Sequence, residues 1–148
     1  MGQSPEGSSV VSSASNNGVE FHQGKIFFND DRLDKSNVVT TSPQKLSEPN
    51  SVLMSVRAPV GPVVIVDRII CIGRGLANIV PLCDMSDKFL LYLLRGFQKD
   101  FLLKATGTTF IAITMENLKN QIIPLPPLAE QKRIVERLET LFHEIAAL

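Results

Sequence analysis

The most regular hydrophobic pattern of the chain lies at its C-terminal end. Apolar residues recur there in steps of 4, 3, 4 and 3, at Ile134, Leu138, Leu141, Ile145 and Leu148. This is the spacing of the a and d positions of a coiled coil. The prolines at 126 and 127 disfavour helix ahead of it. We predict a helix over residues 126–148 whose apolar seam contacts another helix, although a helix lying on its own domain fits the same spacing.

Between residues 51 and 80 the apolar positions form short runs rich in β-branched side chains. The runs cover residues 51–56, 63–66, 69–72 and 76–80, with glycine or proline between them. Such runs are typical of strands. Four of them in close succession predict a small curved or barrel-like sheet.

After this region the hydrophobic period becomes helical. Ser86 and Asp87 are good N-cap residues, and the apolar face continues through Phe97 and Phe101. We predict one buried helix that ends near Gly107. A strand at 110–113, a helical turn at 114–118 and an extended piece at 121–125 follow.

The rest of the N-terminal half is mostly polar. We predict loops over residues 1–20 and 29–50, and a short strand over 21–28 with a turn at Gly24. The fold class is therefore α+β. A small curved or barrel-like β unit with packed helices covers residues 1–125, and a long C-terminal helix covers 126–148.

Composition changes this picture little. Hydrophobic residues make up 44% of the chain and charged residues 20%, as in an ordinary globular protein. Fifteen basic and fifteen acidic residues give a net charge of zero, whereas a nucleic-acid-binding protein usually has a basic excess. Residues 57–104 hold seven basic and four acidic residues. This local excess is a weak signal for nucleic-acid binding.

No arrangement of residues typical of catalysis occurs along the chain. His22 and His143 lack metal-ligand spacing, and a Walker A motif is absent. Cys71 and Cys83 do not form a CxxC pair, and we expect them to fill the core rather than form a disulfide. Because no catalytic arrangement occurs, we expect that the protein is not an enzyme. We expect it to be cytoplasmic, because it has neither a signal-peptide pattern nor an apolar run of about 18 residues.

Arg57 is the one charged residue whose position suggests recognition. It follows the predicted strand 51–56 and precedes a turn at 58–61. An arginine fixed at a strand end can donate two hydrogen bonds to a phosphate or a guanine. A salt bridge inside the domain is an equally good interpretation.

Several motifs resemble the specificity (S) subunits of type I restriction–modification systems. The stretch IPLPPLAEQKRIV at 123–135 resembles the hallmark that ends a target-recognition domain of that family. VLMSVRAPVG at 52–61 and CIGRGL at 71–76 resemble the middle of such a domain. MGQSP at 1–5, FHQGK at 21–25, GTT at 107–109 and ITMENL at 113–118 resemble its other parts, in the family's order.

The resemblance implies a DNA-specificity role. S subunits carry two target-recognition domains, each reading half of a split DNA site, and two conserved helices that pair as a coiled-coil spacer. Methyltransferase (M) and restriction (R) subunits dock on this framework. S-adenosylmethionine, ATP and Mg²⁺ are then expected only in those partners, and this chain is expected to hold no cofactor.

The resemblance covers one domain and one helix. We therefore expect a half-subunit or fragment, lacking the strand and helix that usually begin the domain. Its partners would be double-stranded DNA, the M and R subunits, and a second copy or a second specificity half. A helix over 127–148 would span about 33 Å at 1.5 Å per residue, close to the roughly 34 Å between half-sites one DNA turn apart.

Residues in or beside loops of these motifs are the expected DNA contacts. They are Gln3, Ser4, Gln23, Lys25, Arg57, Arg74, Thr108 and Thr109. The competing hypothesis is an interaction protein without a DNA role that oligomerises through the C-terminal seam. A nuclease or methyltransferase is a third class, and no motif supports it.

Overall fold

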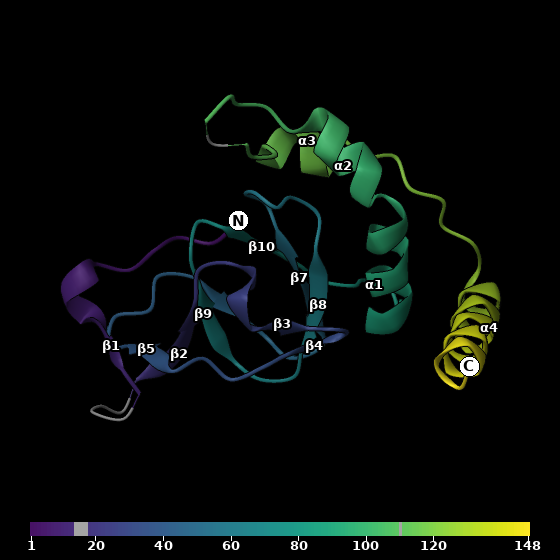
Figure 1. The fold of residues 1–148 in the computed structure, drawn as a ribbon, viewed down its shortest axis with the longest axis horizontal. Coiled ribbons are helices and arrows are strands. Elements are labelled where there is room, and N and C mark those ends of the chain that lie inside the picture. Colours follow the sequence, from purple (N-terminus) through teal and green to yellow (C-terminus); the bar gives the residue numbers. More distant parts are fainter. Residues whose placement is uncertain (14–17, 110) are drawn as a thin grey trace.

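The chain forms two five-stranded sheets and four α-helices in a computed structural model that describes residues 1–13, 18–109 and 111–148 (Figure 1). The first sheet has the order β1 (Val10–Ser12), β5 (Val38–Thr40), β2 (Val19–His22), β9 (Ile70–Ile72), β6 (Leu46–Ser47). The second has the order β10 (Leu76–Ile79), β7 (Ser51–Ser55), β8 (Val63–Val66), β4 (Arg32–Leu33), β3 (Phe28–Asn29). The helices are α1 (Asp87–Gly96), α2 (Gln98–Lys104), α3 (Met115–Lys119) and α4 (Leu128–Ala146), and short 3₁₀ turns lie at η1 (Gly7–Ser9) and η2 (Lys25–Phe27).

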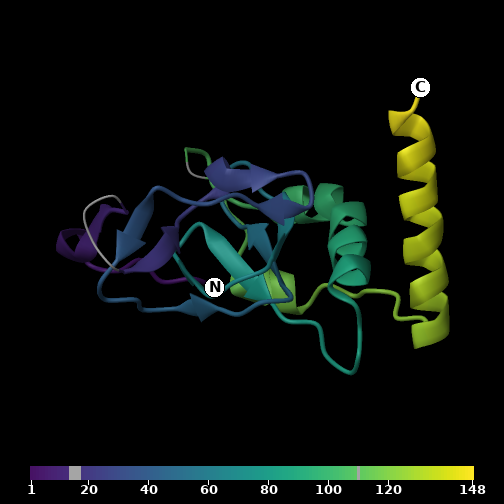
Figure 2. The same cartoon turned by 90° about the horizontal axis from the view of Figure 1, so that it is seen from below.

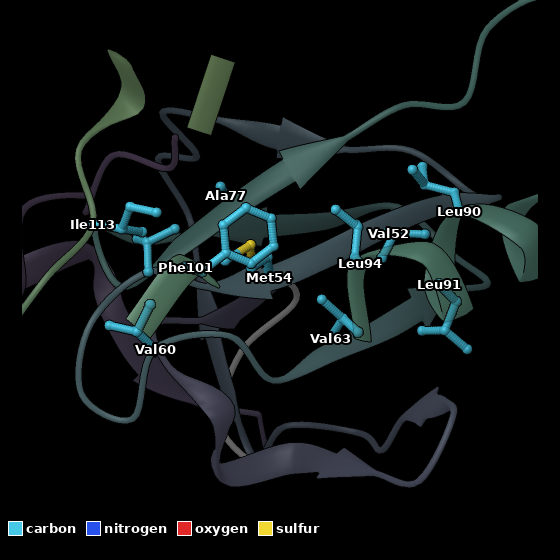
Figure 3. Packing of buried hydrophobic residues seen from close by; sticks show 11 residues of the cluster. Val52, Met54, Val60, Val63, Ala77, Leu90, Leu91, Leu94, Phe101 and Ile113 are labelled. Atoms are coloured by element: carbon cyan, nitrogen blue, oxygen red, sulfur yellow. The ribbon is translucent and has the colours of Figure 1, made fainter. Parts of the chain in front are cut away.

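The central strands are mostly apolar because they are covered on both faces. All five residues of β7 are buried. Val52 and Met54 point to the helices, where they meet Leu94 and Phe101 (Figure 3). Leu53, between them in sequence, belongs to a second cluster on the opposite face, with residues of β8, β9 and β10. Successive side chains of a strand alternate between faces, so a doubly covered strand is apolar on both faces, and the buried Ser51 and Ser55 at the ends of β7 donate hydrogen bonds to backbone carbonyls.

The α+β class is confirmed, whereas the arrangement predicted for residues 51–80 is wrong in one respect. Three of the four predicted strands, β7, β8 and β10, form antiparallel neighbours. The remaining one, β9, lies in the other sheet, where it pairs in parallel with β2 and antiparallel with β6. Local spacing identifies strands, but pairing between distant segments decides which sheet they join.

The predicted loops contain strands that are too short to be recognised from their sequence. β1 lies in the stretch 1–20, of which residues 14–17 fall outside the described part, and β4, β5 and β6 lie in the stretch 29–50. Each has two or three residues. Residues 21–28 hold the end of β2, the turn η2 and the start of β3 rather than one strand. These strands depend on their partners, because so few residues cannot specify a strand locally.

Helix starts follow the sequence more closely than helix ends. Ser86 caps α1 by accepting a hydrogen bond from the Phe89 N–H at 3.0 Å, as predicted. The predicted single helix is interrupted, since α1 ends at Gly96 and α2 begins at Gln98. Residue 110 of the predicted strand 110–113 lies outside the described part, and Ala112 forms isolated bridges rather than a strand.

Helix α4 stands at the edge of the molecule beside α1 (Figure 2). Lys88 of α1 forms an ion pair with Glu139, and the rings of Tyr92 and Phe142 lie 5.7 Å apart. One side of α4 therefore rests on its own domain. Ile134, Leu138 and Leu141 of the seam are half-buried, but Ile145 and Leu148 are exposed at 64% and 105%.

A network around Glu20 ties the first sheet to two loops. The Arg68 guanidinium donates to both carboxylate oxygens of Glu20 at 2.7 and 2.8 Å and to the backbone carbonyls of Leu33 and Asp34. Glu20 also accepts the Ser36 N–H at 2.7 Å and contacts Nε2 of the buried His22 at 2.8 Å. Burial alone would raise the pKa of Glu20, but the hydrogen bonds, led by Arg68, lower it to about 2. Burial lowers the pKa of His22, and the Glu20 contact only partly offsets this.

Stability should fall in two steps as the pH is lowered. The buried His22 resists protonation, so the unfolded chain gains a proton first and stability falls below about pH 6.5. The stabilisation that ionised Glu20 contributes to the folded state is complete above about pH 4.5, and it is lost as the pH falls towards about 2. Glu20→Gln should cost about 2–3 kcal/mol at pH 7 and remove the lower step.

Urea unfolding between pH 7 and pH 2.5 measures both steps. Glu6→Gln is the matched control, because Glu6 is exposed and its side chain has no ion pair within the described residues. Equal pH profiles for the two variants would contradict the role assigned to Glu20.

Candidate nucleic-acid interface

The first group of candidate contact residues lies around the turn between β9 and β10. The Leu76 N–H donates to the Gly73 carbonyl at 3.1 Å, which closes a turn with Arg74 and Gly75 at its centre. The Gly73 N–H donates to the His22 carbonyl at 2.7 Å. The Gly2 N–H donates to the Leu76 carbonyl at 2.8 Å. Segments from three parts of the sequence therefore meet at this turn through their backbones.

The glycines of this turn are needed because other backbone segments approach them closely. A Cβ atom on Gly75 would lie 2.1 Å from the Gln23 carbonyl oxygen, and one on Gly2 would lie 2.3 Å from the Gly73 carbonyl oxygen. Such separations are far shorter than a van der Waals contact, so the backbone would have to move. These motif glycines therefore hold the scaffold in place and leave binding to the side chains around them.

Gly75→Ala should destabilise the fold by about 1–3 kcal/mol, because the added methyl group meets backbone rather than a flexible side chain. Gly24→Ala is the matched control. Gly24 lies beside the same turn, and a Cβ there would meet nothing within 4 Å. Chemical denaturation of the two variants compares them directly. Equal stability would show that the turn accommodates a side chain.

Four of the predicted contact residues lie around this turn. The Gln3 N–H donates to the Ile72 carbonyl at 3.0 Å, and the Arg74 N–H lies 3.4 Å from the Ser4 hydroxyl. The Gln23 backbone packs on Gly75, as described above. The side chains of Gln3, Gln23 and Arg74 are exposed, and that of Ser4 is half-buried. The turn thus gathers polar side chains from distant parts of the sequence, with Ser4 and Arg74 70 positions apart.

Arg57 and Arg74 lie at the same end of the second sheet. The Val56 N–H donates to the Gly75 carbonyl at 2.9 Å, which continues the pairing of β7 with β10 beyond both strands. Arg57 follows Val56, and Arg74 precedes Gly75. Both arginines are exposed, and neither forms a salt bridge with any residue in the described ranges. The alternative interpretation of Arg57 as half of an internal salt bridge therefore finds no support.

Thr108 and Thr109 lie in a loop held beside Arg57. Thr106 and Ala112 exchange two backbone hydrogen bonds, of 2.9 and 3.0 Å, which close the loop. Ala112 also bridges Arg57, and the Ala58 N–H donates to the Ile111 carbonyl at 3.0 Å. Both threonines are exposed. The loop is therefore anchored on the segment that carries Arg57.

Lys25 occupies a different position. It begins η2 and lines a hollow that is also formed by Asp30 and Arg95. Two exposed lysines were not predicted as contacts: Lys45, whose carbonyl accepts the Ile72 N–H, and Lys119, which follows Leu118 of the cluster on which Met1 packs. Neither lies in a loop of a motif that drew attention, and only the folded chain brings them near the N-terminal residues. The sequence contains no signal that would have marked them.

The described residues contain no group of three or more His, Cys, Asp or Glu side chains placed to hold a metal ion. Both cysteines are free thiols, and Cys71 is buried as expected, whereas the expectation that Cys83 fills the core is wrong because it lies exposed. None of the described helices combines the length and the apolar character needed to cross a membrane.

Comparison with known proteins gives a consistent result. Residues 14–147 match the family model of the type I restriction modification DNA specificity domain. The chain is 40% identical over 144 residues to the putative type I restriction enzyme MjaX specificity subunit of Methanocaldococcus jannaschii, a match that covers 95% of this chain and 33% of that protein.

Solved structures agree with this match. The HsdS subunit from Thermoanaerobacter tengcongensis is 39% identical with a TM-score of 0.85, over 99% of this chain and 35% of that one. A chain from a study of complex assembly and conformational transition of the type I R-M system is 41% identical with a TM-score of 0.86, over 99% of this chain and 36% of that one. The S subunit from M. genitalium, 21% identical with a TM-score of 0.70, shares the fold. The chain spans about a third of the length of these relatives.

Proposed function

Because the chain belongs to the type I restriction modification DNA specificity domain family, we propose that it reads DNA sequence for a type I restriction–modification complex. Residues 1–125 form the target-recognition domain, and residues 126–148 form a spacer helix. Its relatives are named specificity subunits, and we propose that this chain likewise does no chemistry itself. It positions methyltransferase and restriction subunits, and S-adenosylmethionine, ATP and Mg²⁺ act in those partners.

The observation that carries this proposal is the placement of Arg57 and Arg74. Two exposed guanidinium groups, with no carboxylate partner among the described residues, lie at one end of the sheet that contains the fully buried strand β7. Arginine matches the two acceptors of guanine in the major groove, or a phosphate, through paired hydrogen bonds. Hydrogen bonds to other segments hold the backbone around both arginines. Less conformational entropy is therefore lost when the arginines bind.

The surrounding polar residues complete the proposed interface. Gln3, Ser4 and Gln23 lie beside Arg74, whereas Thr108 and Thr109 lie beside Arg57. Amides can read adenine, and hydroxyl groups can contact bases or phosphates. Lys25 lines a separate hollow and would contact a phosphate at the margin of this surface. Among the described residues, Arg57 and Arg74 are two of several exposed cations without an ion pair, and the fold places these two at the same end of one sheet.

Repeated selection from a random duplex pool tests the proposal. Purified chain, or the chain with its methyltransferase subunit, is used to enrich duplexes over several rounds, and the enriched pool is sequenced. We expect a short shared motif, bound about 10³-fold or more tightly than random duplex at the same salt concentration. An enriched pool without a common motif would refute sequence reading.

The seam of α4 supports a second part of the proposal, a helical partner. Ile134 and Leu138 line a hollow with residues of α1, whereas Ile145 and Leu148 are exposed, so the C-terminal end of the stripe is free to contact another helix. The partner would be a second copy or a second specificity half. The observed helix has 19 residues and spans about 28 Å, somewhat less than the spacing of half-sites one DNA turn apart.

Ile145→Asp should abolish association through this seam, because it places a charge in a contact between apolar side chains. Ile145 is 64% exposed, so the fold itself should be unaffected. Thr140→Asp, at an exposed position on another face of α4, is the control. Light scattering measures the mass of each variant. If the chain oligomerises through this seam but binds no duplex, the competing hypothesis of an interaction protein without a DNA role gains support.

A further inference from the structure

The N-terminal residues are surrounded by positive charge that no motif predicted. Lys45 and Lys119 are 74 positions apart in sequence, one before β6 and one at the end of α3. Both are exposed, and neither forms an ion pair with a carboxylate among the residues described. Among the described residues, two cations from distant segments are therefore available to bind an anion.

Backbone hydrogen bonds fix the position of Lys45 relative to the turn. The Ile72 N–H donates to the Lys45 carbonyl at 2.9 Å, and the Ile72 carbonyl accepts the Gln3 N–H at 3.0 Å. Lys45 and Gln3 are thus bonded to the same residue of β9. Arg74 lies two residues further along the chain, with its own N–H next to Ser4.

Packing links the segment that carries Lys119 to the N-terminal residue Met1. Met1 and Leu118 both pack on the buried cluster that contains Phe101 and Ile113. Burial, followed by repulsion from Lys45 and Lys119, lowers the pKa of the Met1 amino group. Met1 and Leu118 therefore share one cluster, Lys119 directly follows Leu118, and the direction of the Met1 pKa shift agrees with positive charges nearby.

We propose that Lys45 and Lys119 bind two phosphates of the DNA backbone and thereby position the duplex against Arg74 and the residues beside it. The inference rests on the proposed function and adds two contacts to it. Lysine ammonium groups on flexible stems neutralise phosphates without reading bases. Arginine and the polar side chains would then supply sequence discrimination, and the two lysines would supply affinity and register.

A salt titration of duplex binding tests this division of roles. The full chain, its Lys45→Gln, Lys119→Gln variant and a control variant are titrated with a 30-base-pair random-sequence duplex between 50 and 200 mM salt. The control is Lys35→Gln, Lys132→Gln, which removes two exposed lysines located elsewhere. Each phosphate contact adds roughly 0.9 to the slope of log affinity against log salt. The test variant should therefore lose about 1.8 from its slope, or about 12-fold of the affinity change across this range.

The outcomes separate this inference from the function on which it rests. A reduced slope in the test variant and an unchanged slope in the control support it, even if the wild type shows no preference for any sequence. Equal slopes in all three proteins overturn it, while leaving sequence reading intact if selection enriches a motif. Absence of duplex binding by the wild type overturns both. The ratio of affinities for an enriched and a random duplex should be unchanged in the test variant, and a fall in that ratio would show that the lysines read bases.

Discussion

Removing both candidate reading arginines, in an Arg57→Ala, Arg74→Ala variant, should eliminate most sequence-specific DNA binding. Each two-pronged arginine contact to a base contributes about 1–3 kcal/mol of discrimination. The pair should therefore cost about 2–6 kcal/mol, which corresponds to at least about 30-fold in the affinity for the selected duplex. Both side chains are exposed and lack salt bridges in the described part of the chain, so the unfolding free energy should change by less than about 0.5 kcal/mol.

Matched variants separate recognition from charge. Arg133→Ala, Arg137→Ala removes two exposed arginines from α4 and should leave discrimination unchanged. Arg74→Lys keeps the charge at the turn but lacks the fork of donors. It should keep binding to random duplex and lose preference for the selected one. Fluorescence anisotropy with both duplexes at one salt concentration measures the difference. Discrimination that survives in the double alanine variant would remove these arginines from the proposed interface.

Replacing Phe101 by alanine should have the largest effect on stability. Phe101 is completely buried and packs beside Met54, Ala77 and Ile113 (Figure 3). Truncating such a side chain costs about 3–5 kcal/mol through lost burial and the cavity that remains. A chain of this size has a total stability of about 5–15 kcal/mol, so the variant should be close to unfolding at physiological temperature.

Leu103→Ala provides the control on the same helix. Leu103 is 85% exposed and two positions from Phe101, so its loss should change stability by less than about 0.5 kcal/mol. Thermal unfolding followed by circular dichroism compares the two. Phe101 also packs near Ile113, whose N–H donates to the Val56 carbonyl next to Arg57. The Phe101 variant should therefore loosen the Arg57 segment as well, and similar melting temperatures for both variants would contradict this account of the core.

The elements that could be predicted are those whose pattern repeats within a few residues. The seam of α4, the strands β7, β8 and β10, and the capping residue Ser86 each follow from neighbouring side chains. The strands that were missed have two or three residues. The break between α1 and α2 was also missed, since the apolar face continues across Phe97 and only the residues packed around it decide where the helix turns.

The candidate interface was predictable in kind but not in arrangement. Motif residues gave a set of polar and basic candidates along the chain, and the fold brings Gln3, Ser4, Gln23 and Arg74 to one turn. Lys25 lies elsewhere. Lys45 and Lys119 could be identified as candidates only from the folded structure. No periodicity or spacing in the sequence distinguishes one exposed lysine from another. Whether such a lysine can bind a ligand depends on which residues lie near it in the folded chain.

The sequence by itself determined that this chain has an α+β fold ending in a long amphipathic helix, because helix and strand periods are local properties of the side-chain pattern. It also indicated the family, through motif stretches that resemble those of S subunits and that the family model confirms. Only the tertiary structure decided that β9 leaves its neighbours for the other sheet, that α4 rests one side on α1, and that Arg57 and Arg74 leave one end of a sheet together. Those features depend on contacts between residues far apart in the chain. A local sequence pattern does not indicate the free energy of such contacts.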